Sequence, residues 1–282
     1  MKRILTTLAF PLCLSLSACG GGDDASAPAA PSKFAVKVTY SGLPLVKSRQ
    51  ASKMAAADVV SGASSTVVES DGQATVDTLQ KRFADAATGI TVYPGVIDGT
   101  TLHQIVMSVN NGVGPTQEEL WQYDQNRTKI VMDDWVVLNF QLDDMRTGRN
   151  DPAQVAALDQ FKKDLIVFQN RLYLEGKHVY KIVPIRTCEL PSGQTAADGL
   201  ADVLADVPGS GYLMGLRDAP DRSHMGDDCR TPDAETQEAH LRAIVDPIVA
   251  SYNAVNSLVN DCRTNPSSRT ERECSGIEPV KK

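Results

Sequence analysis

The sequence predicts an α/β fold of three layers, αβα, in which helices cover both faces of a parallel sheet of about five strands. Short β runs alternate with segments of helical spacing from about residue 64 onward. One run, Trp135 to Phe140, is apolar at nearly every position, as expected for a strand that is covered on both faces. Functional residues in such folds lie at the carboxyl ends of the strands.

The first strand-like segment runs from Phe34 to Tyr40, where large apolar side chains recur at every second position. Because it precedes the main alternation, we expect it to be an added N-terminal strand at the edge of the sheet. The main strands are expected at residues 66–68, 90–93, 135–140, 179–185 and, more weakly, 211–216.

Three segments between and after these strands have helical character. Residues 76–87 have helical spacing. Asp151 and Pro152 are typical of a helix start, and an apolar stripe then continues to Leu172. The last helix is expected from near Glu235 to Leu258, with a bend at Pro247.

The N-terminus has the pattern of a bacterial lipoprotein signal. Lys2 and Arg3 precede a short apolar stretch, and the run Leu16-Ser17-Ala18-Cys19 has the form of a lipobox. The apolar stretch is shorter than the ~20 residues of a membrane span. We therefore expect lipid attachment at Cys19 and anchoring in the cell envelope. Gly20 after the cysteine favours the outer membrane over the inner membrane.

These patterns divide the chain into five parts. We expect a signal peptide at 1–18, a flexible tether at 19–32, an extension with one strand at 33–63, the α/β domain at 64–259 and a polar tail at 260–282. Four cysteines follow the tether, which in an exported chain indicates two disulfides. We predict the pairs Cys188–Cys229, at one rim of the sheet, and Cys262–Cys274, which would close a short loop in the tail.

The charge of the chain excludes several function classes. The net charge of −7 argues against nucleic-acid binding, which needs basic residues, and against electrostatic adhesion to anionic lipids. The membrane is therefore expected as a partner only through the lipid on Cys19. The histidines have no metal-ligand spacing, so neither a metal nor a cofactor is expected.

Three polar segments follow strands or precede the last helix. They are Gly95–Thr101, Asn139–Met145 and Asp221–His224. In their order and spacing they resemble the SGNH/GDSL hydrolases, a family of secreted and lipid-anchored esterases. The resemblance covers roughly residues 64–258 and implies a flavodoxin-like sheet. It also implies a serine nucleophile, a histidine that removes its proton and an aspartate that orients the histidine.

This chain matches only part of that catalytic set. Gly99 matches the oxyanion glycine, and Asp221 and His224 match the Asp–His pair. Asp143 stands where the family has an oxyanion asparagine, and Gly72 stands at the nucleophile position. Loss of one oxyanion donor costs on the order of 10²–10³ in turnover, and loss of a triad serine about 10⁶. The resemblance thus implies a degenerate member whose cleft binds an acyl or acetylated-glycan ligand.

Two alternatives stay open. An active esterase or acylhydrolase would need a displaced nucleophile, for which the candidates are Ser70, Thr100 and Ser223. A structural envelope lipoprotein would have no small ligand. Each matched residue, taken alone, can be explained as an ordinary loop or turn residue. The hypothesis therefore depends on all of them occurring together in the order that the family has.

Overall fold

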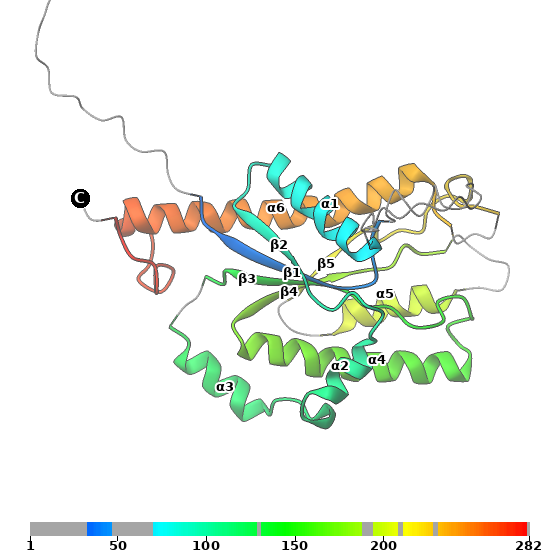
Figure 1. Cartoon of the computed structure of the whole chain (residues 1–282). Coiled ribbons are helices and arrows are strands. Elements are labelled where there is room, and N and C mark those ends of the chain that lie inside the picture. Colours follow the sequence, from blue (N-terminus) through cyan, green and yellow to red (C-terminus); the bar gives the residue numbers. More distant parts are fainter. Residues whose placement is uncertain are drawn as a thin grey trace, which may run out of the picture. The chain divides into compact units, whose positions relative to one another are not determined.

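The structure is a computed structural model that describes residues 33–46, 70–128, 131–187, 194–207, 211–227 and 231–280 (Figure 1). Its centre is a five-stranded sheet with the order β2-β1-β3-β4-β5, in which all neighbouring strands are parallel. This flavodoxin-like order, with helices on both faces, confirms the predicted fold class. The strands are β1 (Val36–Gly42), β2 (Ile90–Pro94), β3 (Asp134–Asn139), β4 (Lys177–Ile182) and β5 (Gly211–Met214).

The predicted edge position of the N-terminal strand is wrong. β1 lies between β2 and β3, and Val38 pairs with both Val92 and Trp135. Its alternating pattern arises because one face packs into the core, where Val38 and Tyr40 are fully buried. Position along the chain does not give position in the sheet, since crossover connections can leave a first strand at the centre. The expected strand at 66–68 lies outside the described residues.

One face of the sheet is covered by α1 (Asp71–Asp85) and α6 (Ala234–Thr264), drawn above the strands in Figure 1. Leu79 and Phe83 of α1 and Ile244 and Ile248 of α6 are buried in one hydrophobic cluster with β1. Arg82 of α1 also forms a bidentate ion pair with Glu238 of α6. These contacts fix the two helices beside each other over the same strands.

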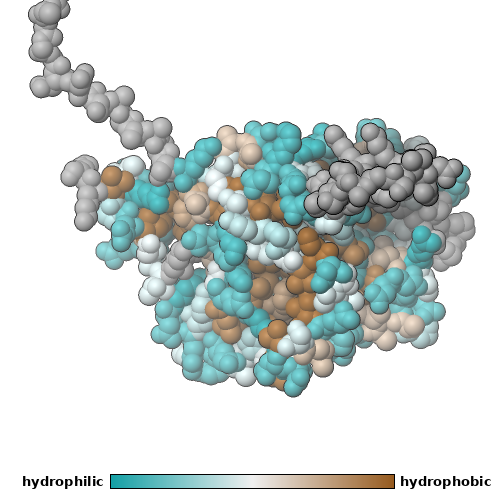
Figure 2. All heavy atoms as spheres, in the orientation of Figure 1, coloured by the Kyte–Doolittle hydropathy of each residue, from teal (hydrophilic) through white to brown (hydrophobic). Residues whose placement is uncertain are grey.

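The opposite face is covered by α2 (Leu102–Ser108), α4 (Pro152–Leu174) and α5 (Ala196–Asp206), and α3 (Gln117–Asn126) packs against α4. Leu165 of α4 and Leu200 of α5 are buried in a second cluster with Val136 and Leu138 of β3. Since β3 contributes side chains to both clusters, its continuous apolar run is explained. Figure 2 shows hydrophobic residues in the middle of the visible face, surrounded by hydrophilic ones.

The helices begin where a side chain satisfies their first backbone N–H groups. Ser70 caps α1 and Thr101 caps α2. Asp151 caps α4, with Pro152 as its first residue, as the sequence predicted. Asp233 caps α6, which continues past Pro247 to Thr264, beyond the expected end near Leu258.

A disulfide joins Cys262 near the end of α6 to Cys274 in the C-terminal segment, with 5.3 Å between their Cα atoms. It is one of the two predicted pairs, and it holds the tail against the last turn of α6. The other predicted pair, Cys188–Cys229, lies outside the described residues. Within the described ranges, no helix is long and apolar enough to cross a membrane.

Candidate ligand site at the carboxyl edge of the sheet

A cavity of about 320 Å³ lies at the carboxyl ends of β1, β3 and β4. In the observed strand order, the chain leaves β1 toward β2, whereas β3 lies on the other side of β1. The connections of the chain therefore run in opposite directions across the sheet on the two sides of β1. In open α/β sheets, ligands bind in the crevice where this direction changes. The wall is formed by residues that follow these strands and by residues of α5, α6 and the turn before α6: Pro44, Leu45, Asn139, Gln141, Met145, Arg146, Pro184, Ile185, Thr187, Ala197, Pro232 and His240.

Asn139, the last residue of β3, fixes the chain that leaves β1. Its side-chain nitrogen donates to the hydroxyl of Tyr40 at 2.9 Å and to the carbonyl oxygen of Leu43 at 2.8 Å. Tyr40 also donates to the Leu43 carbonyl, and burial raises the pKa of Tyr40, so its hydroxyl stays protonated. Asn139 is only 3% exposed. It therefore holds the rim of the cavity in place.

The described chain after β1 brings no nucleophile to this site. Leu43, Pro44, Leu45 and Val46 follow the strand. The hydroxyl of Ser41 is buried in the strand, where it accepts a hydrogen bond from the Val96 N–H at 3.1 Å. The next residues, 47–69, lie outside the described residues.

His240 lies in the buried stripe of α6 and lines the cavity. Its Nδ1 accepts a hydrogen bond from the Leu216 N–H at 3.2 Å. Burial lowers the pKa of His240 to about 4, so the ring is neutral at pH 7. Because Nδ1 is an acceptor, the proton of the neutral ring is on Nε2. The site thus contains a neutral histidine that can donate a hydrogen bond.

His224 precedes α6, as predicted, but its ring faces a different acid from the expected one. Its Nδ1 donates to Asp233 at 2.9 Å, and this hydrogen bond raises the pKa of His224. Hydrogen bonds lower the pKa of Asp233 to about 2. The largest contribution is from the Thr236 N–H, and the next is from the His224 ring. Asp221 contacts His224 through its backbone carbonyl, which accepts from the His224 N–H. Asp233 therefore replaces Asp221 as the group that orients the ring.

Gly72 lies against the loop after β2, and Gly99 belongs to that loop. Gly72 is in the first turn of α1, where a Cβ atom would be 2.6 Å from Ile97 in the loop after β2. Gly99 is in the same loop with φ of +91°, a conformation that favours glycine. Ser70 is committed to capping α1 through Gln73 N, and Thr100 donates to Asp98. Within the described ranges, no hydrogen bond links His224 to any of these residues.

Asp143 lines a second cavity, of about 460 Å³, between the loop after β3 and helices α2 and α4. Its neighbour Asp144 accepts hydrogen bonds from Arg146 and Thr147, so it caps a turn. A second His–Asp pair, absent from the sequence-based set, lies in this cavity: His103 Nδ1 is 3.0 Å from Asp164 Oδ2. The cavity adjoins the first one at Gln141, which lines both.

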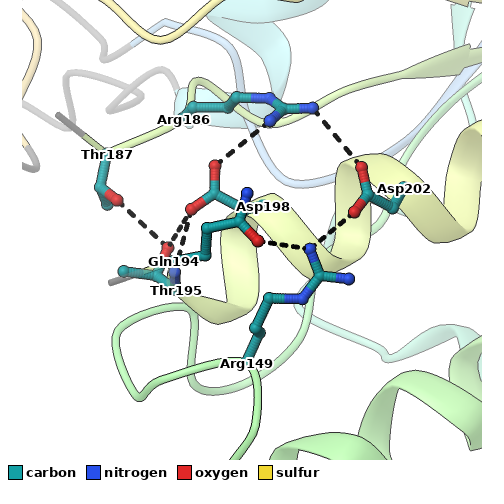
Figure 3. Close-up of polar contacts among 7 residues, drawn as sticks. All are labelled: Arg149, Arg186, Thr187, Gln194, Thr195, Asp198 and Asp202. Atoms are coloured by element: carbon teal, nitrogen blue, oxygen red, sulfur yellow. Dashed lines mark hydrogen bonds and ion pairs between the residues drawn. The ribbon is translucent and has the colours of Figure 1, made fainter. Parts of the chain in front are cut away.

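A network of charged residues holds α5 against the cavity (Figure 3). Asp202 accepts a 2.7 Å hydrogen bond from Arg149, in the turn before α4, and lies 3.7 Å from Arg186, in the loop after β4. Arg186 also contacts Asp198 at 3.4 Å. The two arginines therefore join both loops to one face of α5, which positions Ala197 in the cavity wall.

The sequence analysis missed His240 and Asp233, and it gave no separate role to Asn139, the first residue of the segment Asn139–Met145. Asp233 directly precedes a helical segment, where aspartate is a typical N-cap residue. Its role as the cap of α6 could therefore have been predicted from the sequence. His240 has a weaker signal, since it is a polar residue within the apolar stripe of α6. Among the described residues, no group of three or more potential ligands could hold a metal ion.

No protein-family model matches the chain, and no curated protein sequence matches it significantly. The solved structures that match include TesA and the esterase EstA, and the likeness is distant. TesA is 18% identical, with a TM-score of 0.41 over 77% of this chain and 99% of TesA. The psychrotrophic esterase EstA from Pseudoalteromonas sp., inhibited by monoethylphosphonate, is 13% identical, with a TM-score of 0.37 over 78% of this chain and 96% of EstA. Both scores are low, so neither likeness assigns a family or an activity to this chain.

Proposed function

We propose that this protein is a degenerate, lipid-anchored protein of SGNH/GDSL type that binds a small ligand at the carboxyl edge of its sheet without hydrolysing an ester. One observation carries the proposal: the chain leaving β1 brings Pro44 and Leu45 to the cavity, and His224 is not among the described residues that line it. Asp143 stands where the family has an asparagine, so the amide donor to an oxyanion is missing there.

The composition of the cavity fits an acyl or acetylated-glycan ligand. Leu45, Met145 and Ile185 supply apolar wall that suits an acyl or acetyl group. Arg146 and Gln141 supply hydrogen-bond donors for carbonyl and hydroxyl oxygens, and His240 adds a neutral N–H group. These groups orient a ligand, and none of them is a nucleophile.

Hydrolysis of p-nitrophenyl acetate tests the lack of catalysis. We expect the wild-type protein to be no faster than the His224→Ala variant. A wild-type rate well above that of His224→Ala would overturn the proposal and point to the displaced-nucleophile alternative. In that case Ser70→Ala, Thr100→Ala and Ser223→Ala would show which hydroxyl reacts.

Ligand-induced shifts of the melting temperature test the binding role. We expect acetylated chito-oligosaccharides or short acyl esters to raise Tm of the wild type but not of Met145→Trp, which would fill the cavity. Met107→Trp is the matched control, because Met107 is exposed and lies outside the cavity wall. If no compound of either class shifts Tm, the structural alternative is favoured.

We also propose that Cys19 carries the lipid anchor and that the protein resides in the outer membrane of the cell envelope. The lipobox and the following Gly-rich segment support this. Metabolic labelling with a fatty-acid analogue should label the wild type and leave Cys19→Ser unlabelled and unprocessed. Density-gradient fractionation of membranes should place the labelled protein in the outer-membrane fraction.

A further inference from the structure

A large groove lies on the α6 face of the sheet, between the second half of α6 and strands β3, β4 and β5, and it extends from the amino ends of β3 and β4 to Arg217 after β5. Its volume is about 900 Å³. The wall combines aromatic and aliphatic side chains with small residues of α6: Arg127, Val131, Met132, Trp135, Tyr173, His178, Tyr180, Tyr212, Leu213, Met214, Arg217, Pro247, Ala250, Ser251, Ala254, Val255 and Leu258. None of these residues lines the cavity at the carboxyl edge.

Aromatic rings from three neighbouring strands form one side of the groove. Trp135 pairs with His178 in register, and Tyr180 pairs with Tyr212, so these side chains share one face of the sheet. The rings of His178 and Tyr180 are 4.7 Å apart, and those of Tyr180 and Tyr212 are stacked at 6.1 Å. Trp135 and Tyr180 are only 2% and 1% exposed, so His178 and Tyr212 are the rings of this group that an apolar body can reach.

The position of α6 leaves this surface partly uncovered. The second half of the helix is tied to the start of β1, since Tyr252 donates to the Phe34 carbonyl and Asn256 accepts from the Phe34 N–H. β5, at the far edge, is therefore less covered on this face, and Tyr212 is 60% exposed. Ala250 and Ala254, one turn apart, face the groove with minimal side chains and leave room for a ligand.

The charges around the groove select the kind of ligand. Arg127 and Arg217 are the only lining residues among those described that carry a charge at pH 7, and no carboxylate lines it. His178 is neutral there, because burial lowers its pKa. The guanidinium of Arg127 lies 5.9 Å from the ring of Tyr173. A positive, apolar groove on a chain with a net charge of −7 complements an anion with a hydrophobic body.

We propose that this groove binds a long-chain acyl carboxylate, with the hydrocarbon chain between the exposed rings of β4 and β5 and helix α6, and with the carboxylate near Arg217. Calorimetric titration with three C12 probes tests the proposal on residues 19–282 carrying Cys19→Ser, so that neither an attached acyl chain nor the apolar signal segment competes. Laurate has the proposed anionic head, dodecanol a neutral head and dodecylamine a cationic head. We expect the affinity to fall in that order.

Two variants test the location. Ala254→Trp should weaken laurate and dodecanol alike, by about tenfold or more, because it fills the groove. Arg217→Gln should weaken laurate by roughly threefold or more and leave dodecanol unchanged, since only the charged head is affected. The matched controls are Ala156→Trp and Arg272→Gln, which change exposed residues outside the groove and should bind laurate like the parent protein.

Equal affinity for laurate and dodecylamine would overturn the proposal, and so would unchanged laurate binding by Ala254→Trp. Vesicles of phosphatidylglycerol serve as a further arm. If they bind through Arg217 while laurate does not bind, the groove contacts a membrane surface and the acyl-carboxylate proposal fails.

Discussion

Asp233 joins two roles in one side chain: its Oδ2 accepts a hydrogen bond from the ring of His224, and its Oδ1 caps α6 through the Thr236 N–H. The histidine is thereby fixed to the start of the helix that also carries His240. Two histidines with opposite pKa shifts thus belong to the same end of α6.

Replacing Asp233 by asparagine should lower the pKa of His224 toward its usual value, because the carboxylate that stabilises the charged ring is removed. NMR titration of the ring protons measures this. Asp221→Asn is the control and should cause a much smaller change, since Asp221 contributes the weakest of the charge effects on His224. An equal effect of the two substitutions would show that Asp233 does not orient the ring.

Asn139→Ala should reduce the free energy of unfolding by about 1–3 kcal/mol, because it removes the donor to the buried Tyr40 hydroxyl and one of the two donors to the Leu43 carbonyl. Urea denaturation measures the loss. Asn126→Ala removes an exposed amide that donates to the Gln122 carbonyl and should cost less than about 0.5 kcal/mol. Similar losses for both variants would contradict the role of Asn139 at the cavity rim.

His240 should make the protein less stable in mild acid. The folded-state pKa of about 4 lies below the unfolded value of about 6.5, so the unfolded state binds more protons between these values. Stability should therefore fall as pH decreases from about 6.5 to about 4, by up to about 3 kcal/mol from this residue. Denaturation of wild type and His240→Phe across this range isolates the effect, and parallel pH profiles would rule it out.

Removing the Cys262–Cys274 disulfide should loosen the C-terminal segment. The bond closes a short loop, which the chain-entropy model values at roughly 3 kcal/mol. The Cys262→Ala/Cys274→Ala variant should be cleaved by trypsin at Arg269 or Arg272 faster than the wild type. Unreduced wild type is the reference, and equal cleavage rates would mean that other contacts, such as Ser275 with the Thr128 carbonyl, hold the segment.

The local patterns predicted the five strands that the structure describes and helices α1, α4 and α6, because hydrophobic periodicity and capping depend on neighbouring residues; helices α2, α3 and α5 were not predicted. The strands at β2, β3, β4 and β5 and the start of α4 at Asp151 follow from them. The central position of β1 depends on which strands pair across the chain, and periodicity contains no such information. The same limit hid the site: Asn139 contacts residues that follow β1, and His240 contacts Leu216 across the α6–β5 boundary.

The central place of β1 has a consequence for how the chain folds. A strand at the N-terminal end of the domain gains its partners only when β2 and β3, far along the chain, are present. Such non-local parallel pairs form hydrogen bonds only after long loops have closed. The entropy lost in closing these loops makes folding slow. Until β3 has emerged and docked, the apolar side chains of β1 stay accessible to solvent. This interval would be the period in which the polypeptide depends most on protection from aggregation.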